Sequence, residues 1–282
     1  RTNGFDEIYA QENYPSEKVV NSFGVQDDFM YQYALPILNE RAGTGNPFFS
    51  VLLSISNHPP YVIPPYFHPH SDVLEEQIVE YADWSIRQFM QAAEKQPWFD
   101  NTIFVFLGDH GKMVGTPECE MPQSYNHIPL MIYGKDIKPG VYDGFGGQVD
   151  VSPTLLGLLN ISYLQNNFGV NLLEEERPCM FFTADNLIGA RDSVNMFIYS
   201  PDSQQEFKYK LEEGKLHAAI RFFDCERLLC CHCFAVHLQL FLCLLIHQGA
   251  FYRVLFTRDQ VIVRDGIYDG HLFGRYPPVC PC

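Results

Sequence analysis

The sequence has little positive charge. Lys and Arg together number 19 against 34 Asp and Glu, which gives a net charge of −15. A chain this acidic repels the phosphates of nucleic acid, so we expect no nucleic-acid partner. Hydrophobic residues make up 46% of the chain and charged residues only 19%, which is typical of a folded protein rather than a disordered one.

Cysteine is scarce in the larger part of the chain. Cys119 and Cys179 stand alone, whereas the other cysteines lie between Cys225 and Cys282, so the first part does not need disulfides. The later part also contains Leu228–Ile246, which has no Asp, Glu, Lys or Arg and approaches the length that spans a bilayer. We therefore expect a domain over residues 1–217 and an atypical Cys-rich, apolar tail over residues 218–282. That tail could be native, fused, frame-shifted or a membrane anchor.

The hydrophobic pattern indicates an α/β fold. Two apolar runs, Pro47–Ile55 and Thr102–Leu107, predict buried strands. Between them, apolar residues recur at helical spacing from Leu74 to Ala93 and predict an amphipathic crossover helix. Strand, helix and strand in this order indicate a right-handed βαβ unit in a parallel sheet.

Weaker patterns complete this expectation. They predict a helix over 27–40, a strand over 128–133, a short helix over 152–159 with Ser152 as its cap, and short antiparallel strands over 179–183, 194–199 and 206–210.

The clearest candidate site follows the second predicted strand directly. Gly108-Asp109-His110-Gly111 lies where ligands gather in α/β sheets, at the carboxyl end of a strand. An adjacent Asp and His can offer an oxygen and a nitrogen to one divalent ion. The structural alternative is an Asp that caps the next segment and a His that packs in a loop.

Two further histidines are candidates. His58 follows the first predicted strand, so we expect it at the same edge of the sheet as Asp109 and His110. His127 precedes the strand that begins near Ile128, which favours the opposite edge, although the long loop before it could bring it back. A single histidine at a strand end is commonly structural, but several polar groups at two strand ends favour a site.

Four motifs, in order along the chain, carry a resemblance to a known family. The sequence resembles the sulfatase-like branch of the alkaline phosphatase superfamily over about residues 1–215, and within it the lipoteichoic acid synthase and phosphoglycerol transferase group. The motifs are Ser56-Asn57-His58-Pro59-Pro60-Tyr61, Phe106-Leu107-Gly108-Asp109-His110-Gly111, Tyr125-Asn126-His127-Ile128-Pro129-Leu130-Met131-Ile132-Tyr133 and Gly147-Gln148-Val149-Asp150-Val151-Ser152-Pro153-Thr154-Leu155-Leu156.

The resemblance implies a fold and a chemistry. The fold would be an α/β sandwich with a mainly parallel sheet, flanking helices and a short antiparallel C-terminal part. Asp109 and His110 would bind one divalent metal ion (Mn²⁺, Mg²⁺ or Zn²⁺), His58 would contact the transferred phosphoryl group, and His127 would be a further catalytic residue. The substrate would be a phospholipid or an envelope glycan or polymer. The domain would face the outside of the cell membrane behind N-terminal transmembrane helices.

The chain also departs from the family pattern. The family supplies a Thr nucleophile and an acidic metal ligand from a region upstream of anything present, and Arg1 is neither an initiating Met nor part of an apolar leader. We therefore expect the natural protein to start earlier and this chain alone to be inactive. Cys119 does not have the spacing of a sulfatase nucleophile. A sulfate ester hydrolase and a non-catalytic relic of the fold remain as alternatives.

Overall fold

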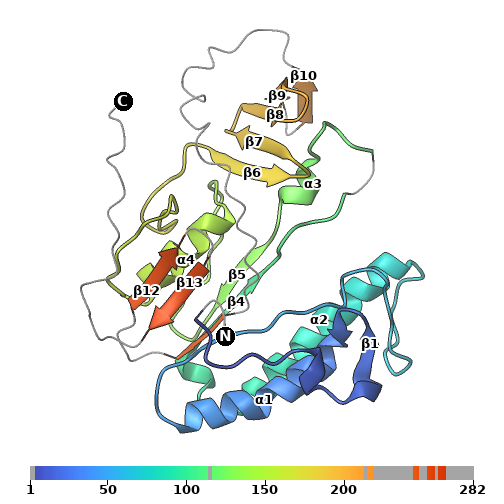
Figure 1. Cartoon of the computed structure of the whole chain (residues 1–282), viewed down its shortest axis with the longest axis vertical. Coiled ribbons are helices and arrows are strands. Elements are labelled where there is room, and N and C mark those ends of the chain that lie inside the picture. The colour runs from blue at the N-terminus through green and yellow to red at the C-terminus, as the bar shows by residue number, and fades with distance from the viewer. Residues whose placement is uncertain are drawn as a thin grey trace.

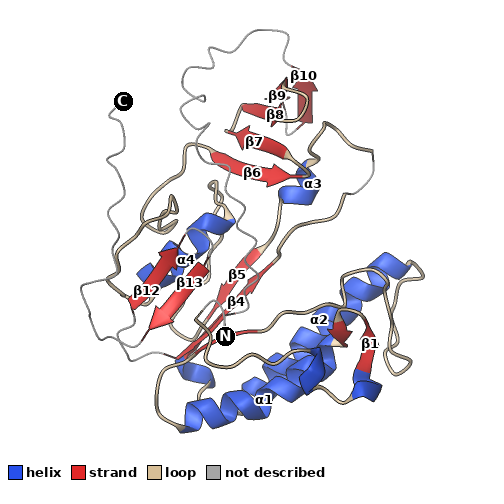
Figure 2. Ribbon diagram, viewed as in Figure 1, coloured by secondary structure: helices blue, strands red, loops and turns tan. Residues whose placement is uncertain are grey.

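A computed structural model describes residues 4–113, 116–212, 215–218, 244–247, 253–257 and 260–264. Helices flank a central sheet, and a second sheet lies beyond one end of it (Figures 1 and 2). The predicted tail lies mostly outside the described residues. So does the apolar stretch 228–246, except for Leu244–Ile246, which belongs to a strand, β11 (Leu244–His247).

Three main helices build the outer layers of the fold. They are α1 (Asp27–Gly43), α2 (Leu74–Ala93) and α4 (Gln148–Leu158). The helices α1 and α2 match the predicted positions within a few residues. The two pack against each other in one layer, as Figure 1 shows, because both present apolar side chains to a shared core that includes Tyr31, Leu38 and Phe89.

The central sheet has the strand order β3 (Phe49–Val51), β11, β4 (Thr102–Leu107) and β5 (Leu130–Tyr133). Alternate residues of β4 point to opposite faces, as a strand requires. Phe104 packs into the core with α1 and α2, whereas Ile103 and Val105 pack against α4. The central strand is therefore covered on both faces, which explains why its sequence is continuously apolar.

The α/β class is confirmed, but the strand pairings correct the expectation of a mainly parallel sheet. Within the described residues, β3 and β4 run in the same direction and are not neighbours, because β11 lies between them and is antiparallel to both. The hydrogen-bonding groups of β3 and β4 on these sides are therefore satisfied by β11 rather than by each other. The strand β5 is also antiparallel to β4.

The C-terminal part forms the predicted antiparallel sheet. Its order is β10 (Lys215–Ala218), β9 (Gln205–Glu212), β8 (Asn195–Ser200), β7 (Leu187–Arg191) and β6 (Met180–Ala184). Hydrophobic periodicity missed β7, whose Gly189 and Arg191 interrupt the pattern. The sheet covers a small core of its own that contains Met121, Met196 and Ile198.

The predicted start of the helix after residue 150 was wrong. Ser152-Pro153 looks like a cap followed by a first-turn proline, yet α4 begins at Gln148 with Gly147 as its cap. The reason is Asp150, whose Oδ2 accepts the N–H of Gly147 at 2.8 Å and so satisfies a donor that the helix cannot.

Short elements complete the described residues. They are η1 (Gln11–Asn13), η2 (Ser16–Lys18), η3 (Phe99–Asn101), α3 (Gln123–Asn126), the pair β1 (Val19–Asn21) and β2 (Gly24–Val25), and the hairpin β12 (Arg253–Thr257) and β13 (Gln260–Arg264). Over the described ranges, no helix combines the length and the apolar character needed to cross a membrane.

Candidate active site

Asp109 and His110 lie directly beyond the carboxyl end of β4 and face each other. Asp109 Oδ2 and His110 Nε2 are 3.2 Å apart, and both side chains are partly exposed. The other ring nitrogen, His110 Nδ1, lies 2.7 Å from the carbonyl of Gly111. A carbonyl can only accept, so Nδ1 carries the proton and Nε2 of a neutral ring turns its lone pair to the carboxylate. Two acceptors that face each other in this way favour a cation or a proton beside them.

This donor set fits a divalent ion in its chemistry. A carboxylate oxygen and a neutral imidazole nitrogen are the ligands that Mn²⁺ and Zn²⁺ accept in proteins. The described residues contain no group of three or more His, Cys, Asp and Glu side chains arranged to hold a metal. Asp109 and His110 therefore form an incomplete set, to which further ligands must be added for tight binding.

The loop that carries this pair is fixed from two sides. Gln148, at the start of α4, donates from Nε2 to the carbonyls of Gly108 at 3.2 Å and Asp109 at 2.7 Å. On the other side, the N–H of Gly111 donates to the carbonyl of Tyr125 at 2.7 Å. The ring of His110 stacks on that of Tyr125, with centroids 5.1 Å apart. Gln148, from the motif that begins at Gly147, thus helps to position the motif that contains Asp109 and His110.

Only one of the two flanking glycines is required by its surroundings. A Cβ on Gly111 would lie 2.1 Å from the carbonyl oxygen of Ser124, which is far inside contact distance. A Cβ on Gly108 would have its nearest neighbour, in Ile128, at 3.4 Å. Gly111 is therefore needed for a close approach between two backbone segments.

The antiparallel direction of β5 decides between the two expected positions of His127. Leu107 at the end of β4 pairs with Leu130 at the start of β5, so the residues just before β5 lie beside the end of β4. His127 is therefore brought back to the edge that carries Asp109 and His110, and its side chain is exposed. No hydrogen bond links it to those two residues in the described part of the chain.

His58 lies at the same edge, as predicted, because β3 and β4 run in the same direction. Its amide donates to the carbonyl of Ile55 at 3.0 Å. The centroid of its ring lies 4.0 Å from that of the Phe23 ring. His58 Nδ1 is 2.7 Å from the carbonyl of Pro59. His58 and His110 therefore share one tautomer, in which Nδ1–H is held by a nearby carbonyl and Nε2 is left for a ligand.

Lys112 links the two loops of the site, although no sequence motif indicated a role for it. Its ammonium Nζ lies 3.4 Å from the hydroxyl of Tyr61 and 5.5 Å from the centre of that ring. It also lies 3.5 Å from Glu75 Oε1. The hydrogen bond to Tyr61 raises the pKa of Lys112, so the side chain stays a cation. Tyr61 belongs to the His58 loop, and Lys112 therefore joins that loop to the Asp109 loop.

Cys119 is not placed to act as a nucleophile. It is buried in the small core under the C-terminal sheet, and its thiol donates to the carbonyl of Met121 at 3.0 Å. Burial raises the pKa of Cys119, which keeps the thiol protonated. This agrees with the sequence argument that its spacing is wrong for a sulfatase.

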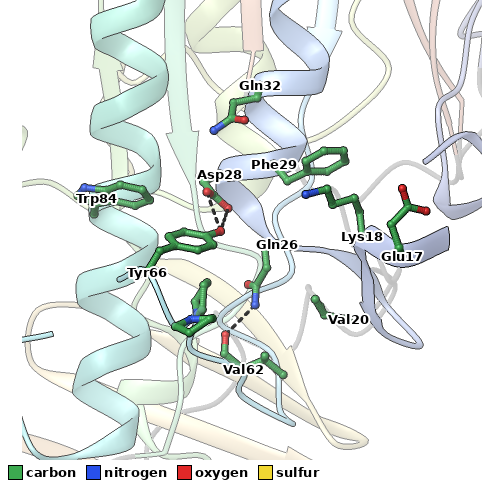
Figure 3. A pocket seen from close by; sticks show the side chains of 12 residues that line it. Glu17, Lys18, Val20, Gln26, Asp28, Phe29, Gln32, Val62, Tyr66 and Trp84 are labelled. Carbon is green, nitrogen blue, oxygen red and sulfur yellow. Dashed lines mark hydrogen bonds between the residues drawn. The ribbon is translucent and has the colours of Figure 1, made fainter. Parts of the chain in front are cut away.

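An open pocket of about 520 Å³ lies between the start of α1, the loop after His58 and α2. Figure 3 shows Asp28, Tyr66 and Trp84 on its wall together with Gln26 and Lys18. The four predicted site residues are absent from its described lining. The pocket is therefore separate from the Asp109 and His110 pair.

Comparisons with known proteins identify the family of the chain. A family model described as Sulfatase matches residues 1–161. The chain therefore belongs to the sulfatase family.

Within that family, the similarities point to the lipoteichoic acid synthases. Lipoteichoic acid synthase 1 of Bacillus subtilis is 24% identical over 250 residues, which cover 77% of this chain and 37% of that protein. A solved structure of an alkaline phosphatase superfamily protein from Vibrio parahaemolyticus has a TM-score of 0.67 and 25% identity, covering 80% of this chain and 56% of that one. The lipoteichoic acid synthase LtaP of Listeria monocytogenes has a TM-score of 0.60 at 23% identity, covering 76% and 58%. The chain spans about a third of the length of the curated relatives it matches.

Proposed function

We propose that this chain is part of an enzyme that transfers phosphoryl groups from phosphodiester head groups, of the phosphoglycerol or phosphoethanolamine type, in envelope lipids or polymers. The observation that carries the proposal is the pair of facing acceptors, Asp109 Oδ2 and His110 Nε2, at the carboxyl edge of β4. The similarity to lipoteichoic acid synthases supports the substrate class. From the family resemblance of its motifs, we also propose a place at the extracytoplasmic face of the cell membrane.

In this proposal Asp109 and His110 bind one divalent ion, with Gln148 holding their loop. When bound, such an ion supplies Lewis acidity and neutralises negative charge on a phosphodiester. The neutral His110 tautomer, fixed by the Gly111 carbonyl, keeps Nε2 available as a ligand. Mn²⁺, Mg²⁺ and Zn²⁺ are all candidates for this position.

His58 contacts the non-bridging oxygens of the transferred group. Because its Nδ1–H is already donated to Pro59, Nε2 can donate to a phosphoryl oxygen only in the imidazolium form. The ammonium of Lys112 lies between the two loops and adds positive charge to the same edge. His127, exposed beside them, is proposed as a further catalytic residue.

The proposal is tested on the longest gene product that contains these residues. It is assayed with Mn²⁺, Mg²⁺ or Zn²⁺ against aryl phosphodiester, phosphate monoester and sulfate ester substrates. We expect metal-dependent cleavage of the diester, abolished by Asp109→Ala, and a loss of about 10² to 10³ in rate for His58→Ala without loss of metal. Preference for the sulfate ester would favour a sulfatase, and no turnover of any ester would favour a non-catalytic relic.

The chain of 282 residues supplies a second test. Two protein ligands are fewer than a tightly held catalytic ion normally has, so we expect weak metal binding and no ester turnover from this chain alone. Metal-dependent turnover that Asp109→Ala abolishes would show that a nucleophile lies within it.

A further inference from the structure

The turn that carries His58 is not held by a sheet. The strand β3 ends at Val51, whereas the predicted strand continued to Ile55, and the residues from Leu52 to His58 form no ladder. Their backbone groups must still find partners where they are buried. Ser56 is such a case, since only 6% of it is exposed. The partners of this turn lie in the residues at the start of α1.

Asp27 provides the main anchor. Its Oδ1 accepts the N–H groups of both Ile55 and Ser56, each at 2.9 Å. In return, the N–H of Asp27 donates to the hydroxyl of Ser56 at 3.2 Å. Asp27 is 2% exposed, so these bonds are shielded from water. A buried carboxylate that accepts two adjacent backbone donors fixes the direction of the chain that follows them.

Gln26 extends the contact to the far side of His58. Its Oε1 accepts the Ser56 hydroxyl at 3.2 Å, and its Nε2 donates to the carbonyl of Val62 at 2.9 Å. Figure 3 shows this bond beside the open pocket. The segment that contains His58 is therefore tied to the start of α1 both before and after the histidine.

Asp28, the next residue of α1, accepts hydrogen bonds from other groups. The carboxylate of Asp28 accepts the hydroxyl of Tyr66 at 2.9 and 3.1 Å and also that of Tyr81. Asp28 is buried like its neighbour, with 7% exposed. It does not accept the amides of Ile55 and Ser56, which both donate to Asp27, and this makes it a matched control for the loss of a buried carboxylate from the same helical turn.

We infer that Asp27 is a positioning residue for His58, which sets the place of the imidazole through the Ile55–His58 turn. Asp27 holds the amides of Ile55 and Ser56, and the carbonyl of Ile55 accepts the amide of His58 at 3.0 Å. The path from the carboxylate to the histidine is thus a continuous chain of hydrogen bonds. The inference rests on the proposed function in one respect, namely that His58 contacts the substrate.

The first measurement is structural and needs no turnover. Hydrogen exchange and NMR on the full chain compare Asp27→Ala, Asp27→Asn and Asp28→Ala with the wild type. We expect Asp27→Ala to speed exchange of the Ile55 and Ser56 amides and to shift the ring resonances of His58. Asp27→Asn retains an acceptor oxygen and should largely restore both signals, and Asp28→Ala should leave them unchanged. Unaltered exchange at Ile55 and Ser56 in Asp27→Ala would overturn the inference.

The second measurement is turnover of bis-p-nitrophenyl phosphate with Mn²⁺ by the longest gene product. A misplacement of about 1 Å can lower a rate by about 10², so we expect a loss of that order for Asp27→Ala and a smaller one for Asp27→Asn. If Asp27 acts through His58, the double variant Asp27→Ala, His58→Ala should be no slower than His58→Ala alone. Multiplied losses in the double variant would mean that Asp27 only supports the fold.

The two hypotheses fail in distinguishable ways. If His58→Ala turns over the diester at the wild-type rate, the proposed role of His58 is wrong, and a catalytic purpose for Asp27 is lost with it. If His58→Ala is slow but Asp27→Ala is not, the proposed function survives and the positioning role is overturned.

Discussion

The ion pair between Asp150 and Arg177 is the contact whose loss should cost the fold most. Asp150 is fully buried, and 14% of the Arg177 side chain is exposed. Arg177 donates from Nε to Oδ2 at 2.7 Å and from Nη2 to Oδ1 at 2.6 Å. The same carboxylate accepts the N–H groups of Gly147 and Val170, each at 2.8 Å. All four bonds converge on one side chain in the first turn of α4.

Arg177→Leu removes the cation and leaves the charge of Asp150 buried. Breaking a buried pair in this way costs about 3–5 kcal/mol. For a domain of this size, each kcal/mol lowers the unfolding midpoint by about 2–4 °C, which predicts a fall of about 6–20 °C. Because Gln148 lies on the same turn and holds the carbonyl of Asp109, metal binding should weaken as well.

Urea unfolding and thermal melting measure this cost. The control is Arg87→Leu, which breaks the exposed pair of Arg87 with Asp83 and should cost under about 1 kcal/mol. Adding Asp150→Asn to Arg177→Leu removes the stranded charge and should restore part of the stability. A loss below about 1 kcal/mol for Arg177→Leu, or a further loss in the double variant, would refute the reasoning.

Three further predictions follow from other contacts. Gly111→Ala should cost about 1–3 kcal/mol and reduce metal affinity, because its Cβ would lie 2.1 Å from the Ser124 carbonyl; Gly108→Ala, measured by the same melts and titrations, should be tolerated. Burial raises the pKa of Asp27 above its usual 3.8, so its contribution to stability is present below that pH and lost as pH rises through the raised pKa. The free energy of unfolding of Asp27→Asn, measured across this pH range, should therefore rise relative to that of the wild type as the pH increases. A constant difference between the two free energies would contradict this expectation. Since burial raises the pKa of Cys119, mass-mapped alkylation should be slow until the protein unfolds, and rapid native labelling would contradict it.

The elements that the sequence could predict are those with strong local signals. The strand Thr102–Leu107 and the helices α1 and α2 follow from apolar runs and periodicity. The strand order could not be predicted, because β11 comes from a segment nearly 140 residues beyond β4 in the chain and pairing between distant segments leaves no local pattern. The extent of β3 was overestimated for a related reason, since Asp27 takes the amides of Ile55 and Ser56 out of any ladder.

The residues of the candidate site also differ in whether a local sequence signal could predict them. Asp109 and His110 were visible because a strand end followed by two ligand types is a local signal, and the edge at which His58 lies followed from the order of strand and helix. The edge of His127 depended on the direction of β5 and stayed open. Lys112 and Gln148 act through contacts with residues distant in sequence. Their roles in catalysis, like those of the four predicted residues, stay predictions.

The two loops of the site are anchored to helices on opposite faces of the central sheet. Asp27 at the start of α1 holds the His58 turn, and Gln148 at the start of α4 holds the Asp109 loop. The spacing between His58 and Asp109 therefore depends on the position of α1 relative to α4 on the two faces of the central sheet. A ligand that touches both loops would lock these layers against sliding. Its binding should then slow hydrogen exchange at the first turns of both helices together, although neither helix need contact the ligand.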